Sequence, residues 1–335
     1  LPPTPILDAS PGAVRLGRTA LSQFHGPLGL LVDDEQRHVP LGPVLHTGTE
    51  DVTRQTHGEI SAPSLGRVVA DPFGAPSRAG LDAETVRLHD GATKSDAWVL
   101  KGPDSSATSW AVLVHGAMSG KDSMLRFARS MAAEGFTSIA VSYRGDQDTT
   151  PPVKASMLGQ TEWQDVEVAV RYARRHGAAR IVLVGVSLGA TISLSFMKNS
   201  ARSRLINGLV LVAPILDWRQ SIRANVRAAR LPAAIAGSAM WLMSHRPWSD
   251  WLRLTEPVRF DELDFSKDGG VTVPALVIHT QGDPVAPYES SRTLRAAMPQ
   301  LVTLIPVEGA DHALEWNRDT AAFDRALQGW LLALK

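Results

Sequence analysis

The 335-residue sequence contains no cysteine. This absence excludes disulfide bonds, thiolate metal sites and a cysteine nucleophile. Net charge is also absent, since 34 Lys and Arg residues balance 34 Asp and Glu residues. A neutral chain lacks the basic footprint of proteins that bind nucleic acid or anionic membrane surfaces, so we expect neither partner. The sequence also lacks a run of about 18 apolar residues, so we expect no integral membrane segment in this chain.

An initial methionine is missing as well, because the sequence starts Leu-Pro-Pro-Thr-Pro. We read this Pro-rich start as a tether, and the chain as a processed or trimmed product. The favoured location is therefore extracytoplasmic or membrane-associated, through an N-terminal segment that this chain does not contain, rather than cytoplasmic. The sequence leaves the oligomeric state open.

The most informative stretch that is present is residues 182–190, Val-Leu-Val-Gly-Val-Ser-Leu-Gly-Ala. An apolar, β-branched run leads directly into a Gly-x-Ser-x-Gly pattern, and an apolar helical pattern follows. This order predicts a strand, a sharp turn with Ser187 at its apex, and a helix. Glycine on both sides of Ser187 tolerates the close backbone approach that such a turn requires. A serine hydroxyl is a weak nucleophile until a base and an anion-stabilising site surround it.

An anion-stabilising site is predicted after the apolar run 110–114, which ends in His115-Gly116-Ala117-Met118. We expect the backbone N–H groups of Ala117 (or Met118, one position on) and Leu188 to bind a developing oxyanion. His115 itself is expected to be a structural loop histidine.

A base and its acid are predicted after two later strand patterns. Asp283 follows the apolar run 274–280 in a Gly-Asp-Pro turn, and His312 follows the run 301–307. With Ser187 they give the chain order Ser, Asp, His of a catalytic triad. Asp217 also follows a strand pattern and is a second candidate for the acid.

Three other acidic residues near His312 are not assigned to the triad. Asp311 is excluded because neighbouring side chains in a loop rarely face each other productively. Glu308 and Glu315 are expected to be solvent-facing or capping groups.

In this combination of features the chain resembles the α/β-hydrolase superfamily over roughly residues 84–335. More narrowly, it is similar to uncharacterised actinobacterial-type serine hydrolases of the esterase, lipase and acyl-peptidase kind. The residue before the serine, Val186, departs from the large side chain that many relatives have there. Four segments carry the narrower likeness: Tyr143-Arg144-Gly145-Asp146, residues 158–166 (LGQTEWQDV), Leu216-Asp217-Trp218 and residues 311–317 (DHALEWN).

The expected fold class is α/β, with a mostly parallel eight-stranded sheet flanked by helices. This expectation rests on apolar runs that alternate with patterns of period 3.6. Strands are expected near 84–89, 96–101, 109–115, 137–143, 180–186, 207–213, 274–280 and 301–306. Helices are expected near 120–134, 161–176, 188–199, 288–297 and 318–334.

Two further regions are expected around this catalytic domain of residues 84–335. Residues 1–83 show short alternating stretches and predict a β-rich N-terminal extension packed on the domain. Its histidines lack metal-ligand spacing, so we expect no zinc site. They are His25, His38, His46 and His57.

The segment 217–270 is longer than an ordinary connection between two strands of a sheet. It predicts a short helical lid over an apolar acyl or aryl pocket. In this interpretation Met118, Trp241 and Trp248 contact the substrate. The aromatic and methionine residues of this region are equally compatible with the buried face of a scaffold helix.

The predicted activity is hydrolysis of small-molecule carboxylic esters through an acyl-enzyme, without cofactor or metal. Ser187 is the nucleophile, His312 the general base and acid, and Asp283 the orienting acid. One alternative is an acyl-peptidase or amidase, in which Arg144 or Arg223 binds a charged terminus. A second is a non-catalytic binding protein of hydrolase fold. The sequence does not indicate which ester is cleaved.

Overall fold

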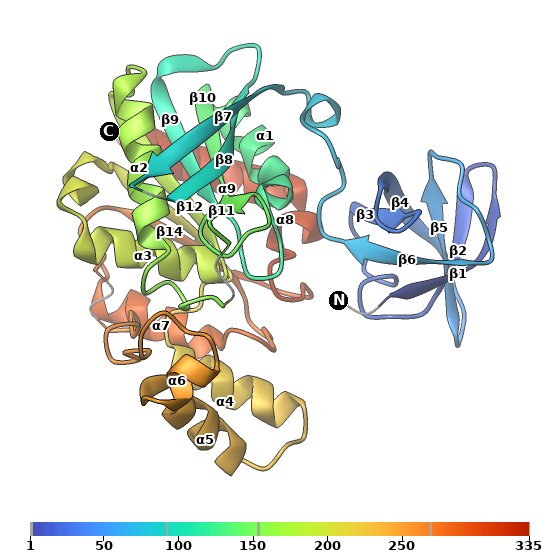
Figure 1. Cartoon of the computed structure of the whole chain (residues 1–335). Coiled ribbons are helices and arrows are strands. Elements are labelled where there is room, and N and C mark those ends of the chain that lie inside the picture. The colour runs from blue at the N-terminus through green and yellow to red at the C-terminus, as the bar shows by residue number, and fades with distance from the viewer. Residues whose placement is uncertain (1–2, 92, 153–154, 268–269, 335) are drawn as a thin grey trace.

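The computed structural model describes residues 3–91, 93–152, 155–267 and 270–334, and its first part is a closed β-barrel (Figure 1). Neighbouring strands are antiparallel, in the order β1-β2-β5-β4-β3-β6. Because β1 begins at Thr4, the expectation of a tether is wrong for residues 4 and 5, while Leu1 and Pro2 lie outside the described residues. The barrel strands are β1 (Thr4–Ser10), β2 (Ala13–Gly17), β3 (Leu28–Val32), β4 (Arg37–Thr47), β5 (Asp51–Thr56) and β6 (Ser64–Val69).

The barrel interior is filled by alternate side chains of its strands, as the two-residue period of a strand requires. In β5 these are Val52, Arg54 and Thr56, all buried. Burial lowers the pKa of Arg54 to about 10, so the guanidinium is still charged at neutral pH. Carbonyl oxygens replace the water that this charge has lost. The guanidinium donates hydrogen bonds to the carbonyl oxygens of Ser22, Phe24, Gly26 and Gly42.

From Asp82 onward the chain forms a second sheet, which has nine strands in the described residues. Strands β10, β9, β12, β13, β14 and β15 pair in parallel, and β7, β8 and β11 add antiparallel pairs at one end. The expected mostly parallel sheet is therefore confirmed, and the two-residue β11 is an addition to the eight expected strands. The strands are β7 (Asp82–Asp90), β8 (Thr93–Lys101), β9 (Ser106–Val114), β10 (Phe136–Val141), β11 (Thr149–Thr150), β12 (Arg180–Val186), β13 (Gly208–Val212), β14 (Ala275–Thr280) and β15 (Val302–Val307).

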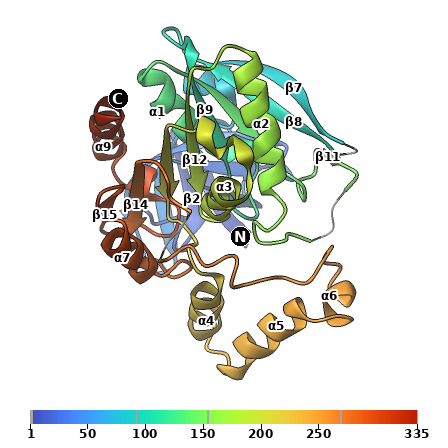
Figure 2. The same ribbon diagram turned by 90° about the vertical axis from the view of Figure 1, so that its left-hand side faces the viewer.

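Helices cover both faces of this sheet (Figure 2). Helices α2 and α3 pack on the face that carries Val112 and Leu183, and α1 and α9 pack on the face that carries Leu113 and Val184. Successive side chains of a strand thus pack against helices on opposite faces of the sheet, and this explains why the strands are apolar throughout. The helices are α1 (Leu125–Ala133), α2 (Trp163–Arg175), α3 (Leu188–Asn199), α7 (Tyr288–Ala297), α8 (Glu315–Arg318) and α9 (Thr320–Ala333).

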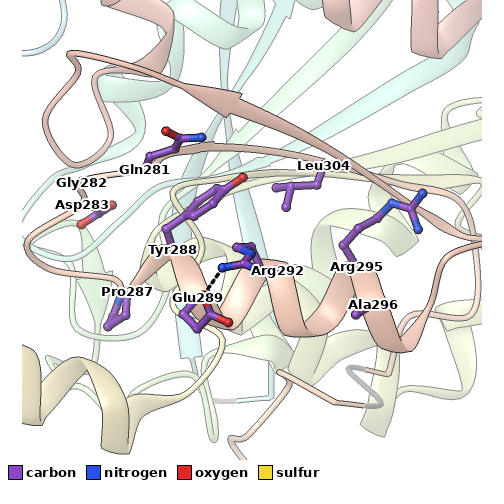
Figure 3. Close-up of a pocket in the computed structure, with 10 residues that line it drawn as sticks. All are labelled: Gln281, Gly282, Asp283, Pro287, Tyr288, Glu289, Arg292, Arg295, Ala296 and Leu304. Carbon is purple, nitrogen blue, oxygen red and sulfur yellow. Dashed lines mark hydrogen bonds and ion pairs between the residues drawn. The ribbon is translucent and has the colours of Figure 1, made fainter.

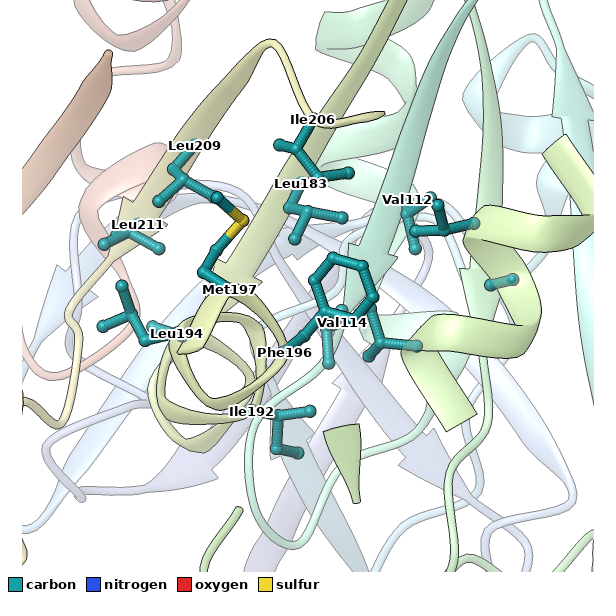
Figure 4. Packing of buried hydrophobic residues seen from close by; sticks show 14 of the residues in the cluster. Val112, Val114, Leu183, Ile192, Leu194, Phe196, Met197, Ile206, Leu209 and Leu211 are labelled. Carbon is teal, nitrogen blue, oxygen red and sulfur yellow. The ribbon is translucent and has the colours of Figure 1, made fainter. Parts of the chain in front are cut away.

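Helix α3 is held tightly against the centre of the sheet (Figure 4). Ile192 and Phe196 of α3 are fully buried in one cluster with Val114 and Leu183 of the strands beneath. Each such side chain stabilises the fold by about 1.5–3 kcal/mol. This packing fixes the first turn of α3, which directly follows Ser187.

Between β13 and β14 the chain leaves the sheet in three helices, α4 (Trp218–Ala228), α5 (Ala234–Ser244) and α6 (Trp248–Trp251). Figures 1 and 2 both show this excursion standing away from the sheet. Its base is held by the Trp218 indole, which donates to Leu158 O, and by the Asn225 amide, which donates to Val285 O.

The barrel meets the rest of the chain around α8. The Asn317 amide donates to the carbonyl oxygens of Pro27 and Ala70. The approach is close, because a Cβ on Gly26 would lie 2.2 Å from Asn317 O. In addition, Leu314 is buried within the apolar cluster of the barrel. No helix in the described part of the chain has the length and apolar character needed to cross a bilayer.

Candidate active site

Ser187 occupies a strained turn between β12 and α3, with φ 55° and ψ −115°. The two flanking glycines are required by contact with neighbouring backbone. A Cβ on Gly185 would lie 2.5 Å from Gly189 O, and one on Gly189 would lie 2.1 Å from Val114 O. Such strain persists only where the surrounding structure enforces it, and it is typical of functional sites.

The structure brings Ser187, His312 and Asp283 together. His312 lies in the loop between β15 and α8, and its Nε2 is 2.8 Å from Ser187 Oγ. Its Nδ1 is 2.6 Å from Asp283 Oδ2. A carboxylate only accepts hydrogen bonds, so Nδ1 carries the proton and the neutral ring accepts the serine hydroxyl at Nε2.

Asp283 follows β14, and its side chain is fully buried. Its Oδ1 accepts the backbone N–H groups of Val285 and Ala286 at 2.7 and 2.8 Å. Burial acts to raise the pKa of Asp283, but hydrogen bonds from His279 and His312, together with the backbone bonds, hold it well below its usual range. Asp283 is therefore a carboxylate throughout the neutral range.

His279 is a second histidine beside Asp283, and the sequence reasoning missed it. It is fully buried at the end of β14, four residues before Asp283. Its Nε2 lies 3.2 Å from Asp283 Oδ2 and 3.1 Å from Ala286 O, so this nitrogen donates. Its Nδ1, 2.7 Å from Ser291 Oγ, accepts the hydroxyl proton. The available signal was a polar residue that ends an apolar strand next to the candidate acid.

The loop after β9 passes directly beside Ser187, because a Cβ on Gly116 would lie 3.2 Å from Ser187 Cβ. Two hydroxyl groups donate to Gly116 O, that of Ser119 at 2.9 Å and that of Tyr143 at 3.2 Å, and His115 Nδ1 lies 2.8 Å from the same oxygen. In a trans peptide the C=O and the following N–H point in opposite directions. The bonds to Gly116 O therefore fix the direction of the Ala117 N–H.

The two expected oxyanion donors, the N–H groups of Ala117 and Leu188, make no hydrogen bond to an acceptor among the described residues. Leu188 is the first residue of α3, where the N–H has no partner within the helix. His115, expected to be structural, is buried under the loop between Gly116 O and Asp146 Oδ2 and stacks on Tyr143. Burial raises the pKa of Tyr143 well above its usual value, so its hydroxyl keeps its proton.

The alternative acid, Asp217, is placed elsewhere. Its Oδ1 accepts the backbone N–H groups of Arg219 and Gln220 and caps the start of α4. The candidate charged subsite at Arg144 is also engaged, because its guanidinium bonds Asp165 through two nitrogens. Arg223 is exposed on α4.

The three expected substrate-binding residues lie on two segments of the chain, Met118 in the loop after β9 and the two tryptophans between β13 and β14. Met118 is 93% exposed. Trp241 of α5 stacks on His245, and Trp248 begins α6. Both tryptophans lie on the excursion, about half exposed.

For Glu315 the expectation of a solvent-facing or simple capping group is wrong. The side chain is 2% exposed, and its Oε1 accepts the backbone N–H of Thr280 at the end of β14. Burial, together with the nearby charge of Asp283, raises the pKa of Glu315 to about 8. Glu308 is exposed, as expected.

An open hollow of about 1010 Å³ runs along α7, behind the loop that carries Asp283 (Figure 3). Its lining includes the charged residues Glu289, Arg292 and Arg295, and Figure 3 shows the Tyr288 ring between Gln281 and Glu289. Asp283 is among its lining residues, whereas Ser187 and His312 are not, so the hollow adjoins the site from the side of Asp283. The described part of the chain contains no cluster of three or more His, Cys, Asp or Glu residues with the geometry of a metal site.

Comparisons with known proteins give relatives that hydrolyse esters and lipids. The lysophosphatidylserine lipase ABHD12 of Macaca fascicularis is 24% identical over 201 residues, which are 57% of this chain and 46% of that protein. The chain thus spans about half the length of this curated relative.

Solved structures share the fold at low sequence identity. The esterase Pf2001 of Pyrococcus furiosus matches with a TM-score of 0.58 and 15% identity, covering 77% of this chain and 95% of that one. A membrane phospholipase A described as a bacterial virulence factor matches with a TM-score of 0.55 and 18% identity, covering 76% and 87%. The esterase RhEst1 of Rhodococcus sp. ECU1013 matches with a TM-score of 0.53 and 17% identity, covering 76% and 100%.

Family models match both parts of the chain. A domain of unknown function matches residues 5–69, which is the barrel. The model of the alpha/beta hydrolase family matches residues 111–326, more than half of the chain. The chain therefore belongs to the alpha/beta hydrolase family.

Proposed function

We propose that the protein hydrolyses carboxylic esters through an acyl-enzyme formed on Ser187. The observation that carries this proposal is the continuous hydrogen-bonded chain from Ser187 Oγ through both nitrogens of His312 to Asp283. Esterases and lipases among the relatives support an ester as the substrate class.

In the first step His312 takes the proton of Ser187 as Oγ attacks the ester carbonyl. Asp283, fixed as a carboxylate, stabilises the imidazolium that forms. The N–H groups of Leu188 and Ala117 bind the oxyanion, and each such donor contributes about 2.7–4 kcal/mol in enzymes of this kind. The positive end of the α3 dipole favours the same charge.

In the second step His312 returns the proton to the leaving alcohol, and the acyl group stays on Ser187. Water then attacks the acyl-enzyme with His312 as base, and the acid product leaves. The amidase alternative needs a free charged subsite for a terminus, and the engagement of Arg144 with Asp165 speaks against that residue.

We further propose that the excursion of α4 to α6 acts as a lid. The supporting contact joins Asn225 of α4 to Val285 O, two residues after Asp283, so the lid base touches the loop that carries the acid.

The test is covalent labelling with a fluorophosphonate together with hydrolysis of p-nitrophenyl esters of increasing acyl length. Wild type is expected to take up one label per chain and to cleave these esters. Ser187→Ala is expected to lose the label and about a thousandfold or more of kcat. Ser64→Ala, at an exposed serine of the barrel, is the matched control. Folded wild-type protein that neither labels nor turns over any ester would favour a non-catalytic binding protein.

A further inference from the structure

The segment from Trp218 to Leu254, which contains α4, α5 and α6, has a charge unlike the rest of the chain. It contains six arginines and one aspartate, with no lysine or glutamate, for a formal net charge of +5. The whole chain has a net charge of zero, so this charge is local. The arginines are Arg219, Arg223, Arg227, Arg230, Arg246 and Arg253.

Most of these arginines are free to meet a ligand. Arg219, Arg223 and Arg227 recur every four positions and therefore lie on one side of α4, and Arg230 follows two residues after the helix ends. Arg219 pairs with Asp261. Arg223, Arg227 and Arg230 are exposed and make no ion pair with any residue that the structure describes.

The same segment exposes large apolar side chains. Trp241, Trp248 and Trp251 are 51%, 45% and 74% exposed, and Leu231 and Ile235 are also exposed. Exposed apolar side chains of this size that gather on one segment mark an interaction site. Tryptophan beside arginine is typical of side chains at a membrane interface, where the ring enters the apolar boundary and the cation remains at the headgroups.

Arginines and apolar side chains also meet in a groove of about 500 Å³ between α4 and α5. Leu231, Ala236 and Met240 line it together with Arg223 and Arg227. An acyl chain fits against such an apolar lining, while arginine binds phosphate oxygens through charge-assisted hydrogen bonds.

We propose that the segment 218–254 docks the protein on the surface of a bilayer that contains anionic phospholipids. Charge complementarity selects the anionic lipid, and the exposed tryptophans select a lipid surface over a purely polar anion. This proposal departs from the expectation of no anionic membrane partner, which was drawn from the neutral total, because a net charge summed over the whole chain does not reveal a local cluster. This inference concerns binding and does not depend on the catalytic proposal.

The experiment is co-sedimentation of the full-length protein with lipid vesicles. The Ser187→Ala protein is used so that the vesicles stay intact. Vesicles of phosphatidylcholine alone are compared with vesicles of phosphatidylcholine and phosphatidylglycerol in equal parts. We expect at least about tenfold tighter binding to the anionic vesicles, and weaker binding at high salt, which screens exposed charges.

Two double variants test the surface, Arg227→Glu with Arg230→Glu and Trp241→Ser with Trp251→Ser. Each is expected to weaken binding to anionic vesicles by about tenfold or more. The matched controls, Arg175→Glu at the end of α2 and Leu65→Ser on the barrel, replace exposed residues outside the segment and should bind as wild type. Equal melting temperatures establish that all variants are folded.

Three results would overturn the proposal. The first is equal binding to both kinds of vesicle. The second is binding lost with the arginines but not with the tryptophans, which would indicate recognition of a soluble polyanion. The third is a dimer seen by light scattering that the tryptophan variant dissociates, which would mean that a second copy of the chain covers the surface. Hydrolysis of a water-soluble ester by the protein with Ser187 intact reports separately on the catalytic proposal.

Discussion

At the scale of single residues, two carboxyl groups near His312 have opposite protonation states. Hydrogen bonds from two histidines and two backbone N–H groups keep Asp283 ionised. Glu315 Oε1 accepts the backbone N–H of Thr280, while its Oε2 has no partner among the described residues. Burial without enough donors favours the neutral acid, so one site contains a fixed carboxylate beside a neutral carboxylic acid.

We predict that Glu315→Gln makes the stability of the protein less dependent on pH between 4.5 and about 8. With its pKa raised to about 8, folded Glu315 holds a proton that the unfolded chain releases at ordinary acidic pH. Its contribution to stability is therefore fully present below the unfolded pKa and is lost as pH rises through about 8. Gln has the shape of the protonated acid and does not titrate. Melting temperatures from pH 5 to about 9 should fall more steeply for wild type than for the variant; parallel curves would contradict the prediction.

A second prediction concerns His279 as a positioning residue for Asp283. His279→Leu removes a donor to Asp283 Oδ2 and should lower kcat about tenfold, with little change in KM, because His279 does not reach the substrate. His279→Gln retains an N–H donor and should recover much of the loss. Steady-state kinetics on a soluble ester measures both variants. Equal losses in the two would indicate that the imidazole matters only for packing.

At the scale of elements, the turn from β12 to α3 requires glycine at position 189, whereas helix α5 does not require it at position 237. Gly189→Ala would place a methyl group 2.1 Å from Val114 O, and that backbone cannot move without disturbing β9. We expect a loss of roughly 2–4 kcal/mol in the free energy of unfolding. Gly237→Ala in α5 meets nothing within 4 Å and should stabilise by about 0.5–1 kcal/mol. Chemical denaturation of both variants measures the contrast, and a stable Gly189→Ala protein would refute the account of the turn.

The elements of the large sheet could be predicted because its strands and helices have strong periodic patterns. Strand β11 could not, because two residues have no period. The barrel was predicted only as a β-rich extension, since its closure depends on the pairing of β1 with β6 across the whole region. The buried guanidinium of Arg54 inside it has no signature in a single sequence.

For the candidate site, the Gly-x-Ser-x-Gly pattern, the positions after strand patterns and the chain order together predicted the three residues that lie together. Side chains around them were missed because burial decides their role. His279 and Glu315 look like an ordinary strand residue and an ordinary surface acid until the fold encloses them. Trp241 and Trp248 are the opposite case. The apolar composition of their segment suggested that they line a substrate pocket, but both side chains are about half exposed.

At the scale of the whole molecule, the barrel is joined to the loop that carries His312. Asn317 donates to Pro27 O and Ala70 O and accepts a hydrogen bond from the buried Arg126. Arg126 also donates to Ala313 O, next to His312. The barrel, α1 and the loop that carries His312 thus share one buried polar network.

We predict that Asn317→Leu destabilises the protein by roughly 2–4 kcal/mol, because it leaves two carbonyls without partners and removes one of the acceptors of the buried Arg126 guanidinium. It should also lower kcat on a soluble ester, since the loop of His312 loses its support. Asn317→Asp keeps an acceptor for Arg126 but replaces the two bonds to the barrel by a carboxylate oxygen that faces the carbonyls of Pro27 and Ala70. Denaturation and kinetics measure both variants, and unchanged values in Asn317→Asp would show that the barrel does not support the loop.

Leu314 has a consequence for how the protein can be divided. It belongs to the chain's last quarter, yet it is buried among residues of the first third, including Leu28 and Val68. A fragment ending at Val69 would lack Leu314 and leave its place in the apolar cluster of the barrel empty. A fragment lacking the barrel would expose Leu314, two residues from His312. The two fragments, expressed separately, should therefore be poorly soluble and should reassociate when mixed, as pieces of one cooperative folding unit.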